Sequence, residues 1–227
     1  LLSIAYLYTP RVARRYDNND RKGMEHLYRQ ATKWSTFLAL PVLLTMLYYP
    51  TEVIRLLFGE EYTAGSTVLM ILVVDIIFRS GTGTAAATLQ AIDRTREDFV
   101  VTAVTTVTNI GVSYILIREL GIIGAAIGTL LSMVLMNTIQ ILLVYRFASI
   151  QPFSWTYGKI IISMSIISLP LSVVLNRVIT DMIIFQYHIP FVMLTFAAFI
   201  VIVESLFAWF GGLLTRGEKE SIRSTIQ

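Results

Sequence analysis

Two oppositely charged residues inside an apolar run are the clearest candidates for chemistry in this sequence. Asp75 and Arg79 stand four residues apart in VLMILVVDIIFRSGTGT, residues 68–84. This spacing puts both side chains on one face of a helix, where they can pair. A charge at membrane depth costs about 3 kcal/mol or more, so the pair requires an explanation. Two remain open: an ion pair that stabilises helix packing, or an arginine that faces a cavity and binds an anion, with Asp75 tuning it or taking part in ion coupling.

Uncharged polar groups in apolar stretches are the next candidates. Asn109 and Asn137 are such groups, and most amides in this setting make hydrogen bonds between helices. The alternative is that they face a cavity that holds a polar substrate. Glu204 in FIVIVESLFAWF is another ionisable residue of an apolar stretch, and the sequence identifies no partner for it. His26 and His188 are too far apart in the chain's topology to share a metal.

Catalysis and cofactor binding find little support in the residues. The chain has no cysteine, which removes disulfides, thiolate nucleophiles and sulfur-ligated metals. The sequence shows no metal cluster, no nucleophile beside a base and no paired carboxylates. The run SGTGT contains glycines, but a phosphate-binding loop would need a strand before it. We therefore predict a protein that is not an enzyme, with no catalytic residues, no metal and no cofactor.

The composition indicates a membrane protein. Of the 227 residues, 55% are hydrophobic and only 15% are charged, and the mean hydropathy is +0.68, which is too apolar for a soluble domain. About twenty apolar residues cross the hydrocarbon core as a helix. The predicted fold class is an all-α polytopic membrane protein with the tail of one span at residues 1–8 and six transmembrane helices, at about 35–58, 66–92, 98–117, 120–145, 157–179 and 190–214.

Lysines and arginines alternate between rich and poor connections along the chain. Seven of them precede the first predicted span, whereas the next connection has Arg55 alone. The positive-inside rule then predicts a cell-membrane protein whose rich segments are cytoplasmic. Residues 21–33 are expected to form either a short basic helix on the membrane surface or a solvated loop. The predicted cytoplasmic segments are residues 9–33, 93–97, 146–156 and the C-terminus.

Glycines in the apolar run LGIIGAAIGTLLS need a reason, because each weakens an isolated helix by roughly 1 kcal/mol relative to alanine. Gly124, Gly128 and Ser132 recur every four residues. They therefore form one helix face without large side chains, on which another helix can pack closely. Gly121 follows Arg118 and is expected to serve a tight turn between two spans. A sliding surface for conformational change is the alternative role of the three helix-packing residues.

The same run resembles a segment of a known family. RELGIIGAAIGTLLS, residues 118–132, is similar to the Pro-x-x-Gly-Ile-x-Gly-Ala-Ala-Ile-Ala-Thr segment of the polysaccharide flippases, the O-antigen and exopolysaccharide exporters of the multidrug/oligosaccharidyl-lipid/polysaccharide (MOP) superfamily. Three further stretches resemble family motifs in the expected order. They are LLFGEEYTAGSTVLMIL (56–72), LQAIDRTRED (89–98) and YLYTPRVARRYDNND (6–20).

This resemblance implies about fourteen helices, arranged as two six-helix lobes with two helices appended. Residues 1–148 would be the remainder of the second lobe, and residues 149–227 would be the two additional C-terminal helices with a short cytoplasmic tail. The chain would then be part of a longer protein and would lack its N-terminal lobe. Ile92-Asp93 and Arg118-Glu119 depart from the family pattern, at positions with no known role in transport.

The resemblance also implies a function, which is to flip lipid-linked oligosaccharide or polysaccharide precursors from the cytoplasmic to the outer leaflet by alternating access. Arg79 would then meet a polyprenyl diphosphate, and Asn109 and Asn137 would face its sugars. Three alternatives remain. A drug or cation antiporter of the same superfamily would need an acidic cavity, and an integral-membrane glycosyltransferase would need larger polar loops. The third alternative is a scaffold. The expected partners are the lipid-linked glycan, the bilayer and the missing lobe, and no nucleic acid.

The orientation can be tested by labelling. We expect residues around Arg94 and residues around Arg118 to react from opposite sides of the membrane, because one predicted span separates them. Accessibility of both positions to an impermeant reagent from the same compartment would contradict the proposed threading.

Overall fold

The computed structural model describes residues 2–82 and 84–153, together with the single residues 155, 158, 159, 162, 198 and 201. The chain divides into two compact units, Leu1–Ser154 and Trp155–Gln227. The helices whose bounds the structure gives all lie in the first unit. The predicted spans at 157–179 and 190–214 lie outside the described residues, apart from those single positions, and so do Glu204 and the C-terminal tail.

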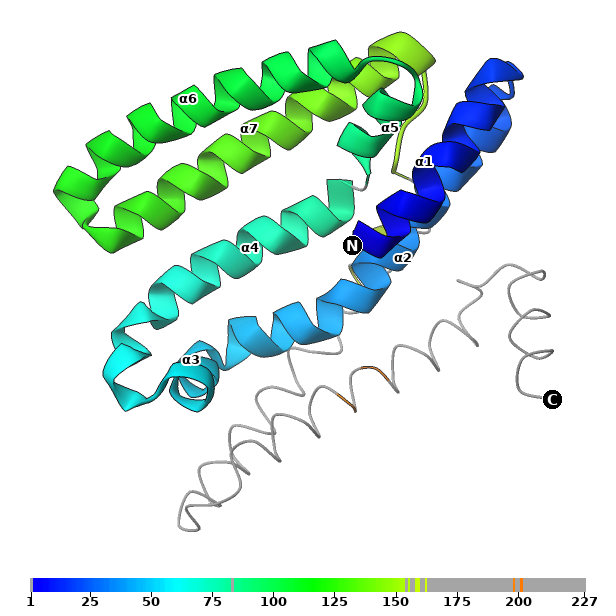
Figure 1. Cartoon of the computed structure of the whole chain (residues 1–227). Coiled ribbons are helices and arrows are strands. Elements are labelled where there is room, and N and C mark those ends of the chain that lie inside the picture. Colours follow the sequence, from blue (N-terminus) through cyan, green and yellow to red (C-terminus); the bar gives the residue numbers. More distant parts are fainter. Residues whose placement is uncertain are drawn as a thin grey trace. The chain divides into compact units, whose positions relative to one another are not determined.

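Helices make up all the regular structure of the described residues, which confirms the all-α class. Figure 1 shows their arrangement, in which long helices lie side by side in pairs. Within the part of the chain that the structure describes, three stretches are long and apolar enough to cross a membrane, and a bent pair would make a fourth. The elements in chain order are α1 (Leu2–Asp17), α2 (Arg21–Tyr48), α3 (Pro50–Phe58), the 3-10 helix η1 (Glu60–Gly65), α4 (Ser66–Thr82), α5 (Ala85–Ala91), α6 (Thr95–Leu120) and α7 (Ile122–Ala148).

A capped turn joins α1 to α2. The Asp20 carboxylate accepts a hydrogen bond from the Gly23 N–H at 2.9 Å and pairs with the Arg15 guanidinium. The Gly23 N–H and Arg15 hold the pKa of Asp20 below its usual 3.8, as expected for an N-cap carboxylate. Residues 21–33 are therefore helical, as one of the two expectations had it, but they are the first part of the long helix α2 and not a short helix; the expectation of a solvated loop is wrong.

The span predicted at 35–58 is not one straight helix. α2 ends at Tyr48 and α3 begins at Pro50, and the two helices meet at 93°. Proline has no N–H to continue a helix and disfavours the helical conformation in the residue before it. Tyr49 accordingly has φ −124° and ψ 51°, and Pro50 occupies the first turn of α3. Hydropathy does not register a change of direction, so the prediction merged two helices that this proline separates.

The span predicted at 66–92 is interrupted. α4 ends at Thr82 and α5 begins at Ala85, within the run SGTGT. Glycine and hydroxylated residues are weak helix formers, the latter because they hydrogen-bond nearby backbone groups. Hydropathy does not detect the break, and the stretch Glu60–Ala91 as a whole is still long and apolar enough to cross a bilayer.

Helices α6 and α7 form an antiparallel hairpin (Figure 1). Gly121 joins them with φ +59°, a backbone conformation that side chains disfavour. A Cβ atom placed on Gly128 would lie 2.9 Å from the Ser113 Cα atom, and one on Gly124 would collide with the Leu116 carbonyl group. Ser132, one turn further along α7, is also buried. This geometry supports the predicted close packing of the small-residue face.

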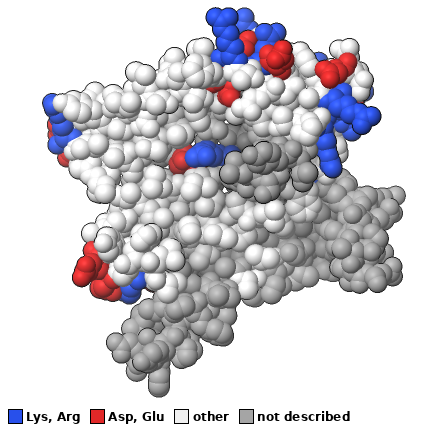
Figure 2. Space-filling view, in the orientation of Figure 1, with Lys and Arg blue, Asp and Glu red and all other residues white. Residues whose placement is uncertain are grey.

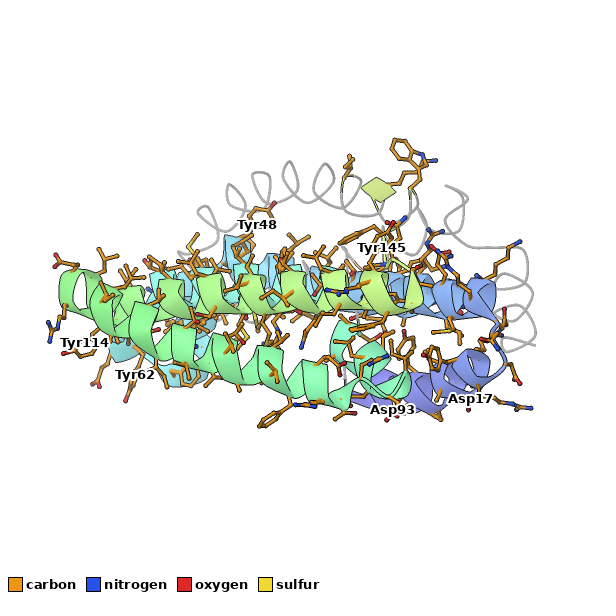
Figure 3. All side chains as sticks on the ribbon, turned by 90° about the horizontal axis from the view of Figure 1, so that it is seen from above. Asp17, Tyr48, Tyr62, Asp93, Tyr114 and Tyr145 are labelled. Carbon is orange, nitrogen blue, oxygen red and sulfur yellow. The ribbon has the colours of Figure 1, made fainter. Side chains whose placement is uncertain are left out.

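The helices run between two ends of the unit. Figure 3 shows Tyr62 and Tyr114 toward one end and Asp17, Asp93 and Tyr145 toward the other. The turn after α1, the turn before α6 and the end of α7 therefore share one end. An apolar cluster of buried residues comes from α1, α2, α5 and α7 and from the residues just after α5 and α7, and includes Tyr8, Val12, Met24, Tyr28, Leu89, Ile92, Val144 and Ile150.

The close contact between α6 and α7 makes a prediction about stability. Gly128→Ala should lower the free energy of unfolding by about 1–3 kcal/mol, because the added methyl group overlaps the Ser113 backbone. Gly111→Ala in α6 is the matched control, since nothing lies within 4 Å of its added Cβ atom. It should be neutral or stabilising by up to about 1 kcal/mol. Thermal unfolding in detergent measures both, and equal effects of the two substitutions would contradict the packing role.

Candidate functional site

Asp75 and Arg79 lie in the second half of α4 and contact each other unequally. The Arg79 Nη1 atom is 3.6 Å from the Asp75 Oδ2 atom, which is too long for a good hydrogen bond. The side chain of Asp75 is only 5% exposed, whereas that of Arg79 is 47% exposed. The Oδ1 atom of Asp75 is buried and has no hydrogen-bond partner. The pair therefore consists of a poorly satisfied buried carboxylate and an accessible guanidinium.

The surroundings of the pair are uncharged. α4 packs against α2 and α7, and residues 34–48 and 122–144 of those helices contain no Asp, Glu, Lys, Arg or His. Figure 2 shows one basic and one acidic surface side by side in the middle of an otherwise uncharged face, while the other visible charges gather at its edges. A cation and an anion attract each other more strongly in the low dielectric of apolar surroundings than in water.

Hydroxyl groups satisfy the end of α4 just beyond Arg79. Thr36 donates to the Ser80 carbonyl at 2.9 Å, and Tyr28 donates to the Thr82 carbonyl at 3.3 Å. A helix end leaves its last carbonyls without intrahelical partners, and burial makes that costly. The two side chains of α2 thus hold the interrupted helix in place. They also fix the turn of α4 from which Arg79 projects.

Asn137 lies one helix away and belongs to the same packing. Thr82 donates from its hydroxyl to the Asn137 Oδ1 atom at 3.0 Å, and the Asn137 amide donates to the Met133 carbonyl at 2.7 Å. The residue is buried, with 8% of its surface exposed. In this conformation both ends of its side chain are engaged between α4 and α7, which resembles the interhelical role more than the substrate-facing one.

Asn109 lies on a different helix and is not brought to the pair. Its Oδ1 atom accepts a hydrogen bond from the Ser113 hydroxyl of the same helix, α6, at 2.7 Å. The side chain is half-buried. Of the four predicted substrate-binding residues, the structure therefore places Asp75 and Arg79 in contact, Asn137 beside the end of the same helix and Asn109 apart from them.

A buried carboxylate that the sequence analysis did not single out is Asp98. Gln140 of α7 donates to its Oδ1 atom at 2.7 Å, and Gln90 of α5 donates to its Oδ2 atom at 3.1 Å. Asp98 also lies in the first turn of α6, where the helix dipole favours a negative charge. The sequence shows Gln90, Asp98 and Gln140 as polar residues near the ends of apolar stretches. Nothing in their spacing predicts that they contact one another.

Among the described residues, Arg79 is the clearest candidate for binding a ligand. Within residues 2–82 and 84–153, no three His, Asp or Glu side chains gather closely enough to hold a metal ion. Asp98 is occupied by its two amide donors. Arg79 remains half-exposed, with a planar set of donors that matches phosphate oxygens.

Known proteins resemble this chain along most of its length. A family model described as Lipid II flippase MurJ matches residues 1–203. The "Probable low-salt glycan biosynthesis flippase Agl15" of Haloferax volcanii is 28% identical over 149 residues, which are 66% of this chain and 32% of that protein. A solved structure, "Lipid II flippase MurJ, inward closed conformation", has a TM-score of 0.69 at 19% identity and covers 94% of this chain and 46% of the other.

The chain thus spans about a third of one relative and less than half of the other. The structural likeness, at 19% identity, establishes the shared fold. The matching family is a family of transporters and not of enzymes, in agreement with the flippase resemblance found in the sequence. Because the family model covers most of its residues, this chain belongs to the MurJ family of lipid II flippases.

Proposed function

We propose that the full-length protein flips a lipid-linked oligosaccharide or polysaccharide precursor across the cell membrane. The observation that carries this proposal is the match of residues 1–203 to a flippase family. The names of two similar proteins agree on the reaction class, one a glycan biosynthesis flippase and the other a lipid II flippase. The substrate would be a glycan carried on a polyprenyl diphosphate, and the chemistry would be translocation without bond cleavage.

The architecture proposed for the whole protein has two lobes that rock about a central site. Residues 1–148 would complete the second lobe, and residues 149–227 would supply two further spans, which brings this chain to six. The lobe missing from this chain would close the other side of the cavity. Alternating exposure of one site to the two leaflets is the behaviour expected of transporters built from two such halves.

The proposed orientation places the end with Asp17, Asp93 and Tyr145 in the cytoplasm (Figure 3). Ten lysines and arginines belong to the segments at this end, namely Arg11, Arg14, Arg15, Arg21, Lys22, Arg29, Lys33, Arg94, Arg96 and Arg146. The opposite end has Arg55 and Arg118, and Arg55 is paired with Glu60 at 3.0 Å. Cytoplasmic loops are enriched in lysine and arginine, so this asymmetry supports the orientation.

Arg79 is proposed as the residue that binds the diphosphate. Its guanidinium is accessible, lies among uncharged helices, and is held only loosely by Asp75. A diphosphate could engage the planar donors in a bidentate manner, which gives both charge neutralisation and orientation. Asn109 and Asn137 stay weaker proposals as sugar contacts, because both amides already make hydrogen bonds within the lobe.

Substitution of Arg79 tests the proposal. In cells that depend on the full-length protein, Arg79→Ala should abolish surface glycan assembly, because no other guanidinium among the described residues lies in the uncharged middle of the unit. Insertion into the membrane and protein abundance should stay normal. Arg118→Ala is the matched control, since Arg118 lies at the end of α6 and contacts Tyr114. Normal glycan export by the Arg79 variant would show that it has no anion-binding role.

A further inference from the structure

The ion pair of α4, between Asp75 and Arg79, satisfies the buried carboxylate less well than a structural ion pair normally does. A buried carboxylate usually needs a close charged partner and hydrogen bonds to both oxygens. Asp75 has a guanidinium at 3.6 Å from one oxygen, and its other oxygen has no partner. Asp98, the other carboxylate buried in this unit, has a donor on each oxygen. The contrast indicates that, among the described residues, the ionised form of Asp75 depends on Arg79 alone.

Other charged groups do not compensate Asp75. α4 packs against α2, α7, α3 and η1, and residues 34–48 of α2 and 122–144 of α7 contain no Asp, Glu, Lys, Arg or His. About nine residues, or roughly 14 Å of helix, separate Asp75 from the start of α4. The titratable groups beyond that start, at the far end of α2 and in α3 and η1, are Tyr48, Tyr49, Glu52, Arg55, Glu60, Glu61 and Tyr62. On the other side, Tyr28, Arg29 and Lys33 of α2 lie near the level of Ser80 and Thr82, beyond Arg79. Within the described residues, Arg79 is the charged group that contacts Asp75.

Two states of the pair follow from this arrangement. When Asp75 is ionised, the pair is neutral overall, and an incoming diphosphate must compete with the carboxylate for the guanidinium. When Asp75 is protonated, Arg79 carries an uncompensated positive charge and is free to turn toward an anion. The 47% exposure of the arginine side chain allows that movement, since one side of it already faces away from the protein.

We propose that Asp75 takes up one proton from water when Arg79 binds a diphosphate, and returns it to water when the diphosphate leaves. This inference rests on the proposed function of Arg79. The proton is held by the Asp75 carboxyl group, whose Oδ1 atom has no hydrogen-bond partner. No bond other than the O–H bond forms or breaks. Binding of the anion and of the proton then strengthen each other, because linkage between two sites is reciprocal.

Calorimetry of the full-length protein can count the proton. Farnesyl diphosphate serves as the probe, titrated at one pH in two buffers that differ in ionisation enthalpy. For the wild type we expect an uptake of up to about one proton per diphosphate, and a loss of affinity approaching tenfold per pH unit above the titration of Asp75. Asp75→Asn, which cannot ionise, should bind with reduced proton uptake and a flatter pH dependence. The probe's own titration is common to all variants.

Two further variants complete the design. Asp98→Asn is the matched control, because Asp98 is buried but already has both oxygens hydrogen-bonded, and it should keep the wild-type proton uptake. Asp75→Ser is a second variant at the proposed site, in case the asparagine does not fold. It should behave like Asp75→Asn, since it also lacks an ionisable group.

The outcomes separate this inference from the proposed function. If Arg79→Gln binds the probe as tightly as the wild type, the anion site is wrong and the inference fails with it. If Arg79→Gln loses binding but both Asp75 variants keep the wild-type uptake of protons, the anion site stands and the proton linkage is overturned. Loss of the linkage in the Asp75 variants alone, with binding retained, is the result that supports the inference.

Discussion

The absence of water in a bilayer's hydrocarbon core constrains this unit more than any other condition. Backbone groups there must find partners within the protein, which is why an interrupted helix is costly. The break between Thr82 and Ala85 is possible because α2 supplies hydroxyl donors opposite it. Thr36 reaches the Ser80 carbonyl and Tyr28 reaches the Thr82 carbonyl. These bonds fix α2 against α4 in one register, and the position of Arg79 follows from that register.

The same constraint divides the buried carboxylates into two kinds. Asp98 accepts one hydrogen bond from α5 and one from α7, so three helices converge on a single satisfied group. Removing any member would leave buried polar groups unpaired, at a cost of about 1–3 kcal/mol each. Asp75 has no such support. Asp98 therefore links three helices through its hydrogen bonds, whereas Asp75 links none through its Oδ1 atom, and this difference supports the proposal that the charge of Asp75 changes.

The sequence predicted the local features well and the distant ones poorly. The contact of Asp75 with Arg79 follows from helical spacing, because residues four apart always share a face. The approach of α7 to α6 at Gly128 follows for the same reason, since small residues at this period leave room for a neighbour. Hydropathy does not show the bend at Pro50, because it measures length and polarity but not direction, although the proline itself marks the place where a helix can end.

The meeting of Asp98 with Gln140 could not be foreseen in the same way. The two residues are 42 positions apart, and their contact depends on the crossing of α6 and α7, which no local spacing encodes. The break after Thr82 shows an intermediate case, in which the weak helix formers of SGTGT were visible but their partners on α2 were not. A spacing of four residues in the sequence predicts contacts within one helix and shows which residues share a helix face. Which residues of two different helices meet is known only once the packing of the helices is known.

The proposed rocking of a lobe as a rigid body would need two kinds of contact, and this unit has candidates for both. Contacts that hold the lobe together must survive every state, and here they are short bonds between neutral groups or to a fully satisfied carboxylate, as between Thr82 and Asn137 at 3.0 Å. A contact with the cargo must instead be gained and lost in each cycle. The charged side chain that contacts the cargo must therefore be accessible without any unfolding of the helices around it. The loose 3.6 Å pair on α4 would meet that requirement in the proposed cycle, because its arginine can exchange partners while the hydroxyl contacts at Ser80 and Thr82 keep the helix in place.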